Sequence, residues 1–245
     1  PLRRRQDSLG RVSREMALVA ALILAALVLV SIVGEVELLP LIGLSLAGGL
    51  AVASLLPLRG RTLRRVPIAT WGMVVAHFGI AVALFGMASD SAFTKERLAA
   101  LEPGQSAEAG PWLVKLDHVT PVAGPNWTAI QGSLSASYNG GEPIVLTPQA
   151  RSFWAPPQAT TESALATRWN GQLYAVIGEE AGQGRWQIRL WWKPFVTWIW
   201  YGGALVALGG VLALVGRVLG DLKRRSVTRR AGARRAEVRA LEPAE

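Results

Sequence analysis

Four long stretches of apolar residues dominate the pattern of hydrophobic and polar positions along the chain. They cover residues 16–33, 38–58, 68–88 and 195–215, and none of them contains a charged residue. At about 1.5 Å of rise per residue, roughly twenty residues of helix cross the hydrocarbon core of a bilayer. The pattern therefore predicts an α-helical membrane protein with four transmembrane helices.

Residues 89–194 break this pattern with shorter runs of strand character. Asn139-Gly140 is a typical hairpin turn, and Gly182-Gln183-Gly184 separates two later runs. We also expect a short helix over 161–169, capped by Thr160 or Thr161. The sequence predicts a small antiparallel β-rich domain between the third and fourth helices, with strands near residues 112–119, 128–138, 144–146, 172–178 and 185–192.

The distribution of charge indicates an orientation in the membrane. The net charge is +9, and 18 of the 26 Lys and Arg residues fall in three segments beside the helices, at 1–15, 59–67 and 216–245. With four helices these segments lie on one side, and cytoplasmic loops are the ones rich in Lys and Arg. We therefore expect cytoplasmic basic termini that contact membrane lipid, an external domain at 89–194, and no nucleic-acid partner.

His77 is the tenth residue of the third apolar stretch, which places its imidazole near the bilayer midplane. An ionisable side chain at that depth is costly and usually faces a partner, a cavity or a metal. A hydrogen bond between helices and a functional role such as iron ligation are equally compatible with this position. The only other histidine, His118, falls in the external domain and is expected to be a solvated strand residue, so a second axial ligand would have to come from elsewhere.

Small residues recur in the third stretch with spacings of four and three, and glycines recur every seven residues in the fourth. Such stripes let neighbouring helices approach closely. We interpret them as packing surfaces, with His77 lying about 100° round the helix from the first stripe. The stripes comprise Gly72, Ala76, Gly79, Ala83 and Gly86, and Gly202, Gly209 and Gly216.

Composition removes several classes of function. The chain has no cysteine, so it neither forms disulfides nor attaches haem covalently to itself. It has no Ser-His-Asp arrangement, phosphate-binding glycine loop or metal-spaced cluster, so the catalytic residues, if any, are unknown. Among its ten tryptophans, Trp191, Trp192, Trp198 and Trp200 are expected to anchor the outer end of the fourth helix in an interfacial belt.

Five segments of the chain form a recognisable series: WGMVVAHFG at 71–79, GPNW at 124–127, TTESA at 160–164, LYAVIGE at 173–179 and, the most distinctive, WKPFVTWIWYGG at 192–203. These segments resemble the CcmF-type haem lyases of bacterial cytochrome c maturation. The similarity covers about residues 68–215 in the same order.

The resemblance implies a role for His77 and a set of partners. It implies that His77 is one axial ligand of a transmembrane haem b in the bacterial inner membrane, with the domain at 89–194 in the periplasm. The second axial ligand, the tryptophan-rich haem-handling segment and two further histidines of the family have no counterpart in this sequence. We therefore expect the C-terminal part of a haem lyase, inactive alone, whose partners are the remaining N-terminal part, CcmH-like and CcmI-like subunits, a CcmE-like haem chaperone and apocytochrome c.

Two other functions stay open from the sequence. The chain could be a non-catalytic assembly subunit that anchors the β-rich domain for partner binding. It could also be a haem b electron carrier whose second ligand is His77 of a symmetry mate. A transporter is the weakest alternative, because the apolar stretches contain no second ionisable residue.

Overall fold

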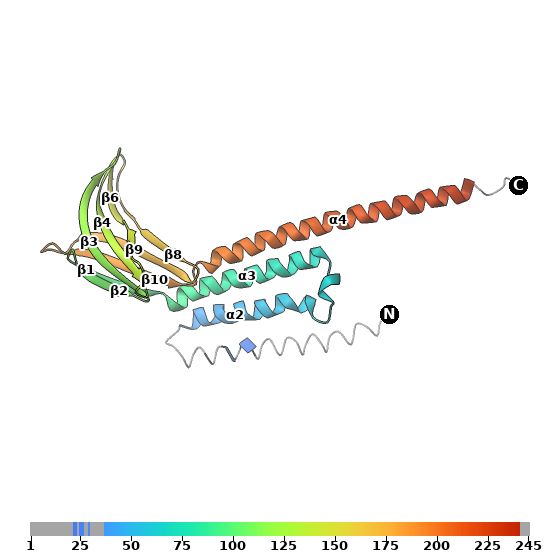
Figure 1. The fold of residues 1–245 in the computed structure, drawn as a ribbon, viewed down its shortest axis with the longest axis horizontal. Helices are drawn as coiled ribbons and strands as arrows, with labels where there is room; N and C mark the ends of the chain where they lie inside the picture. Colours follow the sequence, from blue (N-terminus) through green and yellow to red (C-terminus); the bar gives the residue numbers. More distant parts are fainter. Residues whose placement is uncertain (1–21, 24, 27–28, 30–36, 241–245) are drawn as a thin grey trace. The chain divides into compact units, whose positions relative to one another are not determined.

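The computed structural model describes residues 22–23, 25–26, 29 and 37–240, with side chains described as far as residue 222. Three α-helices and ten strands make up this part of the chain (Figure 1). The helices are α2 (Leu38–Leu55), α3 (Ile68–Phe93) and α4 (Trp198–Ala240), with short 3₁₀ turns at Leu56–Leu58 and Leu63–Arg65. The strands are β1 (Lys95–Leu101), β2 (Ser106–Ala109), β3 (Trp112–Ala123), β4 (Trp127–Tyr138), β5 (Ile144–Leu146), β6 (Gln149–Trp154), β7 (Pro157–Glu162), β8 (Ala164–Arg168), β9 (Gly171–Glu180) and β10 (Trp186–Pro194).

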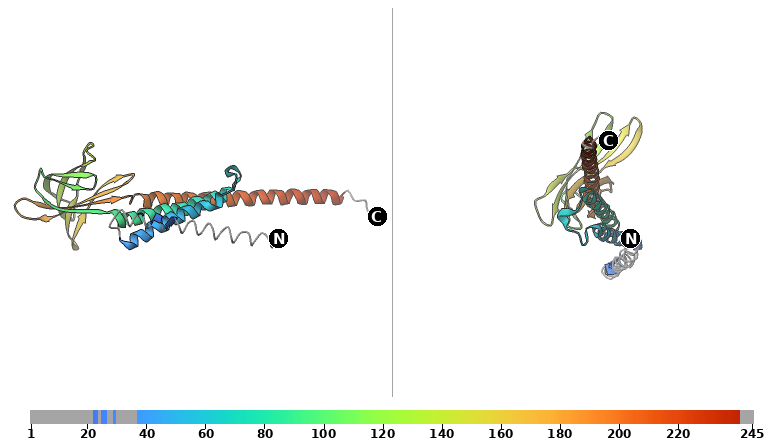
Figure 2. Two further views of the ribbon diagram at one scale, coloured as in Figure 1. Left: turned by 90° about the horizontal axis from the view of Figure 1, so that it is seen from below. Right: turned by 90° about the vertical axis from the view of Figure 1, so that its right-hand side faces the viewer.

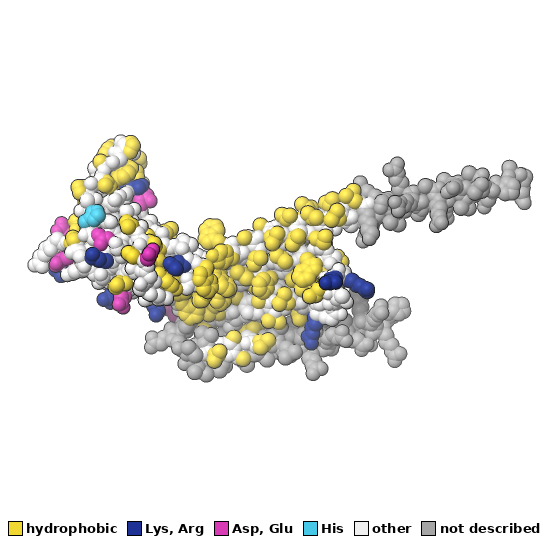
Figure 3. All heavy atoms as spheres, in the orientation of Figure 1, with side chains coloured by type: hydrophobic (Ala, Val, Ile, Leu, Met, Phe, Trp, Pro, Cys, Tyr) yellow, Lys and Arg dark blue, Asp and Glu magenta, His cyan; other side chains and the backbone are white. Residues whose placement is uncertain are grey.

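The membrane character predicted from the apolar stretches is confirmed for the described residues. Helices at Leu38–Leu58, Ile68–Phe93 and Trp198–Leu222 are long and apolar enough to cross a bilayer. Their surfaces are largely apolar, whereas acidic and basic side chains gather on the strands (Figure 3). The helix predicted at 16–33 falls mostly outside the described residues.

The chain divides into two compact units. The helical unit includes residues 46–83 and 201–222, and the second unit includes residues 37–45 and 84–200. Helices α3 and α4 lie side by side within the helical unit, as both ribbon views show (Figures 1 and 2). The strands, which we call the β domain (residues 95–194), all belong to the second unit.

Within the helical unit, α3 and α4 meet backbone to backbone. A Cβ added to Gly72 would lie 2.3 Å from the amide nitrogen of Ala213, and one added to Gly209 would lie 2.4 Å from that of Ala76. Real Cβ atoms do not approach backbone this closely, so only glycine fits at these crossings. The packing role predicted for the two stripes is thereby confirmed, and the same close approach recurs at Gly79, Gly202 and Gly216.

The β domain is two antiparallel sheets packed face to face. One sheet has the strand order β1-β10-β9-β8 and the other β2-β3-β4-β6-β7, with β5 paired to β4. Alternate residues of both sheets point between them and form a single apolar core. Its fully buried members include Val114, Leu116, Leu134, Leu173, Ile177, Ile188 and Leu190. The antiparallel β-rich domain predicted between the third and fourth helices is confirmed.

The Asn139-Gly140 hairpin is present as predicted. Both residues have positive φ, 49° and 72°, and the Gly141 N–H donates to the Tyr138 carbonyl at 3.0 Å. This combination is the tight turn whose twist matches the flanking strands. Beyond this turn β4 pairs with β5, and Leu134 lies opposite Leu146.

The prediction of a short helix at 161–169 is wrong. Residues 157–162 form β7, residues 164–168 form β8, and Leu165 pairs with Tyr174 of β9. This pairing turns Ala166 into the core, where it is buried. The strand pairing and burial outweigh a local capping signal, which is worth only about 1 kcal/mol.

The prediction that Trp192 lies in an interfacial aromatic belt is also wrong. Its side chain is buried in the β-domain core, with ring centroids 6.5 Å from Trp112 and 6.1 Å from Tyr138. Trp192 lies on β10, whose even-numbered residues face inward beside Ile188 and Leu190. The alternation of the strand, and not the nearness of α4 in the sequence, decides where this ring points.

Replacing Gly209 by Ala is expected to weaken the α3–α4 contact. The added methyl meets backbone atoms of α3, and such overpacking typically costs about 1–3 kcal/mol. The matched control is Gly210→Ala, because no described atom lies within 4 Å of a Cβ at that position. Thermal unfolding of the detergent-solubilised protein should show a lower Tm for Gly209→Ala and an unchanged or higher Tm for Gly210→Ala; equal Tm values would contradict the packing described here.

Truncating Leu190 is expected to destabilise the β domain. This residue is fully buried between the sheets, so Leu190→Ala should cost about 2–5 kcal/mol. Leu113→Ala serves as its control, because the Leu113 side chain is 48% exposed. Near-ultraviolet circular dichroism during denaturant unfolding should separate the two variants, and a Leu113→Ala effect as large as that of Leu190→Ala would count against this core.

Candidate functional site

His77 lies in the middle of α3, and its ring is held by a hydrogen bond within the helix. The distance from Nδ1 to the carbonyl oxygen of Met73, one turn earlier, is 2.7 Å. A carbonyl oxygen only accepts hydrogen bonds, so Nδ1 must carry the proton. In the neutral imidazole this leaves a lone pair on Nε2, directed away from the helix backbone.

The face of α3 that carries His77 differs from its two packed faces. Gly72 and Gly79 face α4, whereas Val74, Ala81 and Ala88 recur every seven residues on the face where Ala88 meets Gly43 of α2. His77 is exposed on a lateral face between these two, and the exposed apolar residues near it are Met73, Ile80 and Met87. The imidazole is therefore the only ionisable group on an open apolar stripe of the described part of α3.

This geometry suits one half of a haem site. An axial histidine ligand is a neutral imidazole that offers one ring nitrogen to iron while the other nitrogen donates to a carbonyl. The Nδ1 atom of His77 has the carbonyl partner, and its side chain is exposed beside an apolar stripe that can lie against a porphyrin. The described residues contain no group of three or more His, Cys, Asp or Glu side chains that could hold a metal ion.

His118 lies in the other compact unit, exposed on β3. The strand register shifts between Leu116 and His118, so Asp117 sits at a β-bulge. The Asp117 carboxylate accepts a hydrogen bond from Ser135 at 2.5 Å and pairs with Lys115 at 3.4 Å. No side-chain hydrogen bond of His118 is found among the described residues. Its exposed side chain agrees with the solvated strand position expected from the sequence.

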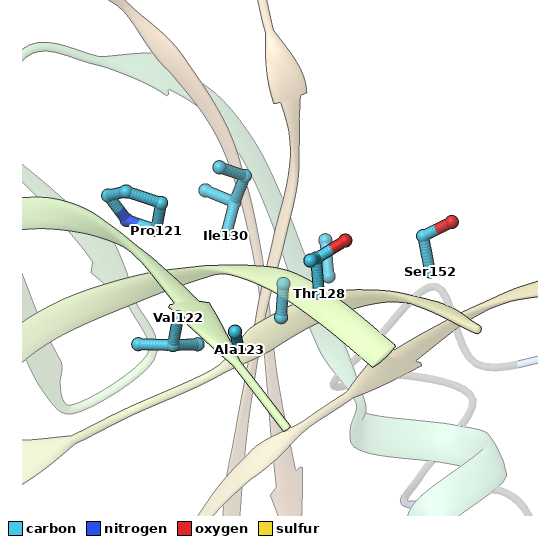
Figure 4. Close-up of a pocket in the computed structure, with 8 residues that line it drawn as sticks. Pro121, Val122, Ala123, Thr128, Ile130 and Ser152 are labelled. Carbon is cyan, nitrogen blue, oxygen red and sulfur yellow. The ribbon is translucent and has the colours of Figure 1, made fainter. Parts of the chain in front are cut away.

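An open cavity of about 350 Å³ is lined by residues of β3, β4 and β6 (Figure 4). Most of its lining side chains are apolar, and Thr128 and Ser152 add two hydroxyl groups. None of the described residues that line it is titratable, so the cavity provides a binding surface and no acid or base. Its lining is Pro121, Val122, Ala123, Thr128, Ala129, Ile130, Ala150 and Ser152.

Two features of the site were not anticipated from the sequence. The Met73 carbonyl holds the His77 ring, and a signal for it existed, because a side chain at position i can reach the carbonyl at i−4 of its own helix. The cavity of the β domain had no such signal, because its lining residues come from three strands.

Comparison with known proteins places this architecture in a family. Residues 92–194 match the family model described as the CcmF C-terminal beta-sandwich. The cytochrome c-type biogenesis protein CycK of Bradyrhizobium diazoefficiens is 35% identical over 232 residues, covering 88% of this chain and 35% of that protein. CcmF of Escherichia coli K12 is 32% identical over 201 residues, covering 81% of this chain and 31% of that protein.

A solved structure shares the fold. The chain named Cytochrome c Heme Lyase CcmF has a TM-score of 0.63 and 20% sequence identity, over 81% of this chain and 34% of its own length. The present chain thus spans about a third of the length of its relatives. Because the matched domain is the C-terminal one and the similarity extends through the neighbouring helices, this chain belongs to the CcmF family and corresponds to the C-terminal region of its members.

Proposed function

We propose that the chain is the C-terminal region of a cytochrome c maturation haem lyase in the bacterial inner membrane, and that His77 is one axial ligand of a transmembrane haem b. One observation carries the ligand role: the Nδ1 atom of His77 is held 2.7 Å from the Met73 carbonyl, which leaves the Nε2 lone pair free on an open apolar face. The names of the relatives, cytochrome c-type biogenesis protein and haem lyase, support the pathway.

The central physical reason for choosing His77 as the ligand is that an imidazole can bind iron without carrying a charge. A charged group at the bilayer midplane costs several kcal/mol, whereas a neutral imidazole is tolerated there and still binds iron. The Met73 carbonyl sets the tautomer and limits rotation of the ring, as outer partners of ligating histidines usually do. When bound, haem would supply one-electron redox chemistry; the chain itself supplies the ligand, its orientation and an apolar wall.

The second axial ligand of this haem would come from outside the chain. The sequence has two histidines, and the other one, His118, is an exposed strand residue of the β domain. The lateral face of α3 around His77 is exposed in the described structure, so a further helix could pack there. The N-terminal part of the haem lyase, which the relatives have in addition, is the natural source of that helix.

The β domain would serve as the periplasmic docking element. Its cavity has apolar walls and no titratable lining residue, which suits binding better than catalysis. In the proposed reaction sequence, a CcmE-like chaperone delivers haem, and CcmH-like and CcmI-like subunits present apocytochrome c. The basic segment between α2 and α3 would face the cytoplasm and its anionic lipid.

Replacing His77 is expected to abolish the haem b signal and cytochrome c maturation in the intact haem lyase complex. Loss of outer partners already costs about 10–100-fold in metal affinity, so loss of the ligand itself should cost at least about tenfold. The measurement is the reduced-minus-oxidised haem spectrum of purified complex, together with the yield of mature cytochrome c. His118→Ala is the matched control and should leave both unchanged.

Added imidazole separates ligand loss from misfolding in this experiment. In His77→Gly the cavity left by the side chain should admit free imidazole and restore part of the haem spectrum. Unchanged haem b content in His77→Ala would overturn the ligand role and leave the chain as an anchor for the β domain.

The proposed orientation is tested by cysteines introduced into this cysteine-free chain. Thr120 is exposed on β3, and Thr62 is exposed in the connection between α2 and α3. A membrane-impermeant maleimide added to spheroplasts should label Thr120→Cys within minutes and label Thr62→Cys only after lysis. The reverse pattern would contradict a periplasmic β domain.

A further inference from the structure

The turn between β8 and β9 is fastened to the first turn of α4. The carbonyl of Trp169 accepts hydrogen bonds from the Thr197 hydroxyl at 3.0 Å and from the indole Nε1 of Trp198 at 3.2 Å. The next carbonyl, of Asn170, accepts the Phe195 N–H at 2.8 Å. Three bonds therefore hold the backbone of this turn against the start of a helix that is long and apolar enough to cross a membrane.

Two neighbouring layers, one apolar and one polar, lie where α3 ends and α4 begins. The apolar layer consists of Phe85, Phe195 and Trp198, whose ring centroids are 5.2–5.6 Å apart. The polar layer is the ion pair of Lys193 with Asp90, at 3.1 Å. On α3, Asp90 lies five positions after Phe85, which is about 7–8 Å of helix.

The Trp169 turn lies at this boundary, because its bonds reach Phe195, Thr197 and Trp198. The lipid headgroups are expected at the same level, because an ion pair is costly in the hydrocarbon region whereas aromatic rings are tolerated there. Tryptophan is enriched there because its ring is apolar while its N–H is polar.

The side chain of Trp169 is nevertheless 68% exposed. Trp200, two residues after Trp198 on α4, is 76% exposed, and the exposed residues that follow it include Tyr201, Leu208 and Val211. Trp169 is thus an exposed ring whose backbone is bonded to the start of α4, a helix long and apolar enough to cross a membrane. An exposed aromatic ring held at the end of such a helix favours lipid over a protein as the group that covers it.

We propose that the β8–β9 turn is a membrane-surface anchor in which Trp169, with Trp200, inserts its ring into the lipid headgroup region. The anchor would fasten the four-stranded sheet to the bilayer at a point other than the two chain connections to α3 and α4. It does not depend on haem ligation by His77.

Spin labels attached to single cysteines test the anchor, because the chain has no cysteine of its own. Trp169→Cys is compared with Trp154→Cys, whose parent residue is 52% exposed at the end of β6, away from the α4 contact. The full chain is reconstituted in vesicles of phosphatidylethanolamine and phosphatidylglycerol. Collision of each label with oxygen, which dissolves in the membrane, is measured against collision with a water-soluble nickel chelate.

The label at position 169 should favour oxygen over nickel several-fold more than the label at position 154. Equal preference at the two positions would overturn the proposal, because the turn would then be in water. Low collision with both reagents at position 169 would also overturn it, in favour of a protein surface covering the turn.

A second measurement applies if Trp169→Cys fails to fold. Lipids brominated near the headgroup should quench part of the tryptophan fluorescence of the unmodified chain. Trp169→Phe should reduce the quenched fraction, whereas Trp154→Phe should leave it unchanged. An unchanged quenched fraction in Trp169→Phe would contradict the anchor.

Discussion

Because Gly72 and Gly209 carry no side chain, the backbones of α3 and α4 approach until no methyl group would fit between them. This contact fixes the rotation of α3 about its axis. Once the glycine face of α3 is turned toward α4, Val74 and Ala81 occupy a second, buried face. His77 is then left on the lateral face, about 140–160° round the helix from Gly72 and Gly79, where its free nitrogen can meet a group from outside the described residues.

The backbone of α3 also holds the His77 ring. Its Nδ1 atom bonds to the Met73 carbonyl of its own helix, so the ring direction depends on α3 alone and not on a neighbouring helix. A ligand held in this way is ready for iron before the rest of the site assembles. Under the proposed function, such preorganisation lets this region contribute half of an axial pair while another segment contributes the other half.

The β domain supplies a second rigid element, organised around Trp112, Tyr138 and Trp192. The three rings lie within 5.2–6.5 Å of one another and join strands of both sheets. Near this cluster, Lys193 bonds to Asp90 of α3 and lies 5.5 Å above the Tyr174 ring. The end of β10 is thereby tied to the end of α3, and the Trp169 turn is tied to the start of α4, so the second unit has defined contacts at the level of the expected headgroups.

Local patterns predicted those elements whose signal lies within a few neighbouring residues. The apolar stretches, the alternation in β9 and β10 and the Asn139-Gly140 turn are signals of this kind. Residues 161–169 were mispredicted because a capping signal is local, whereas the pairing of Leu165 with Tyr174 joins residues on two strands. The prediction for Trp192 failed for a related reason. Its nearness to α4 in the sequence suggested a lipid belt, but the alternation of side chains along β10 points Trp192 into the core.

The sequence by itself determined which of the described segments are long and apolar enough to cross a membrane, where a β-rich domain is inserted and which histidine falls in the middle of an apolar helix, because each depends on composition and spacing along one element. Only the tertiary structure decided that His77 lies on an exposed face of α3, that the Trp169 turn rather than Trp192 contacts the start of α4, and that three strands line an open cavity. These depend on hydrogen bonds and packing between residues far apart in the chain, or on the rotation of one helix against another, and no local pattern encodes them.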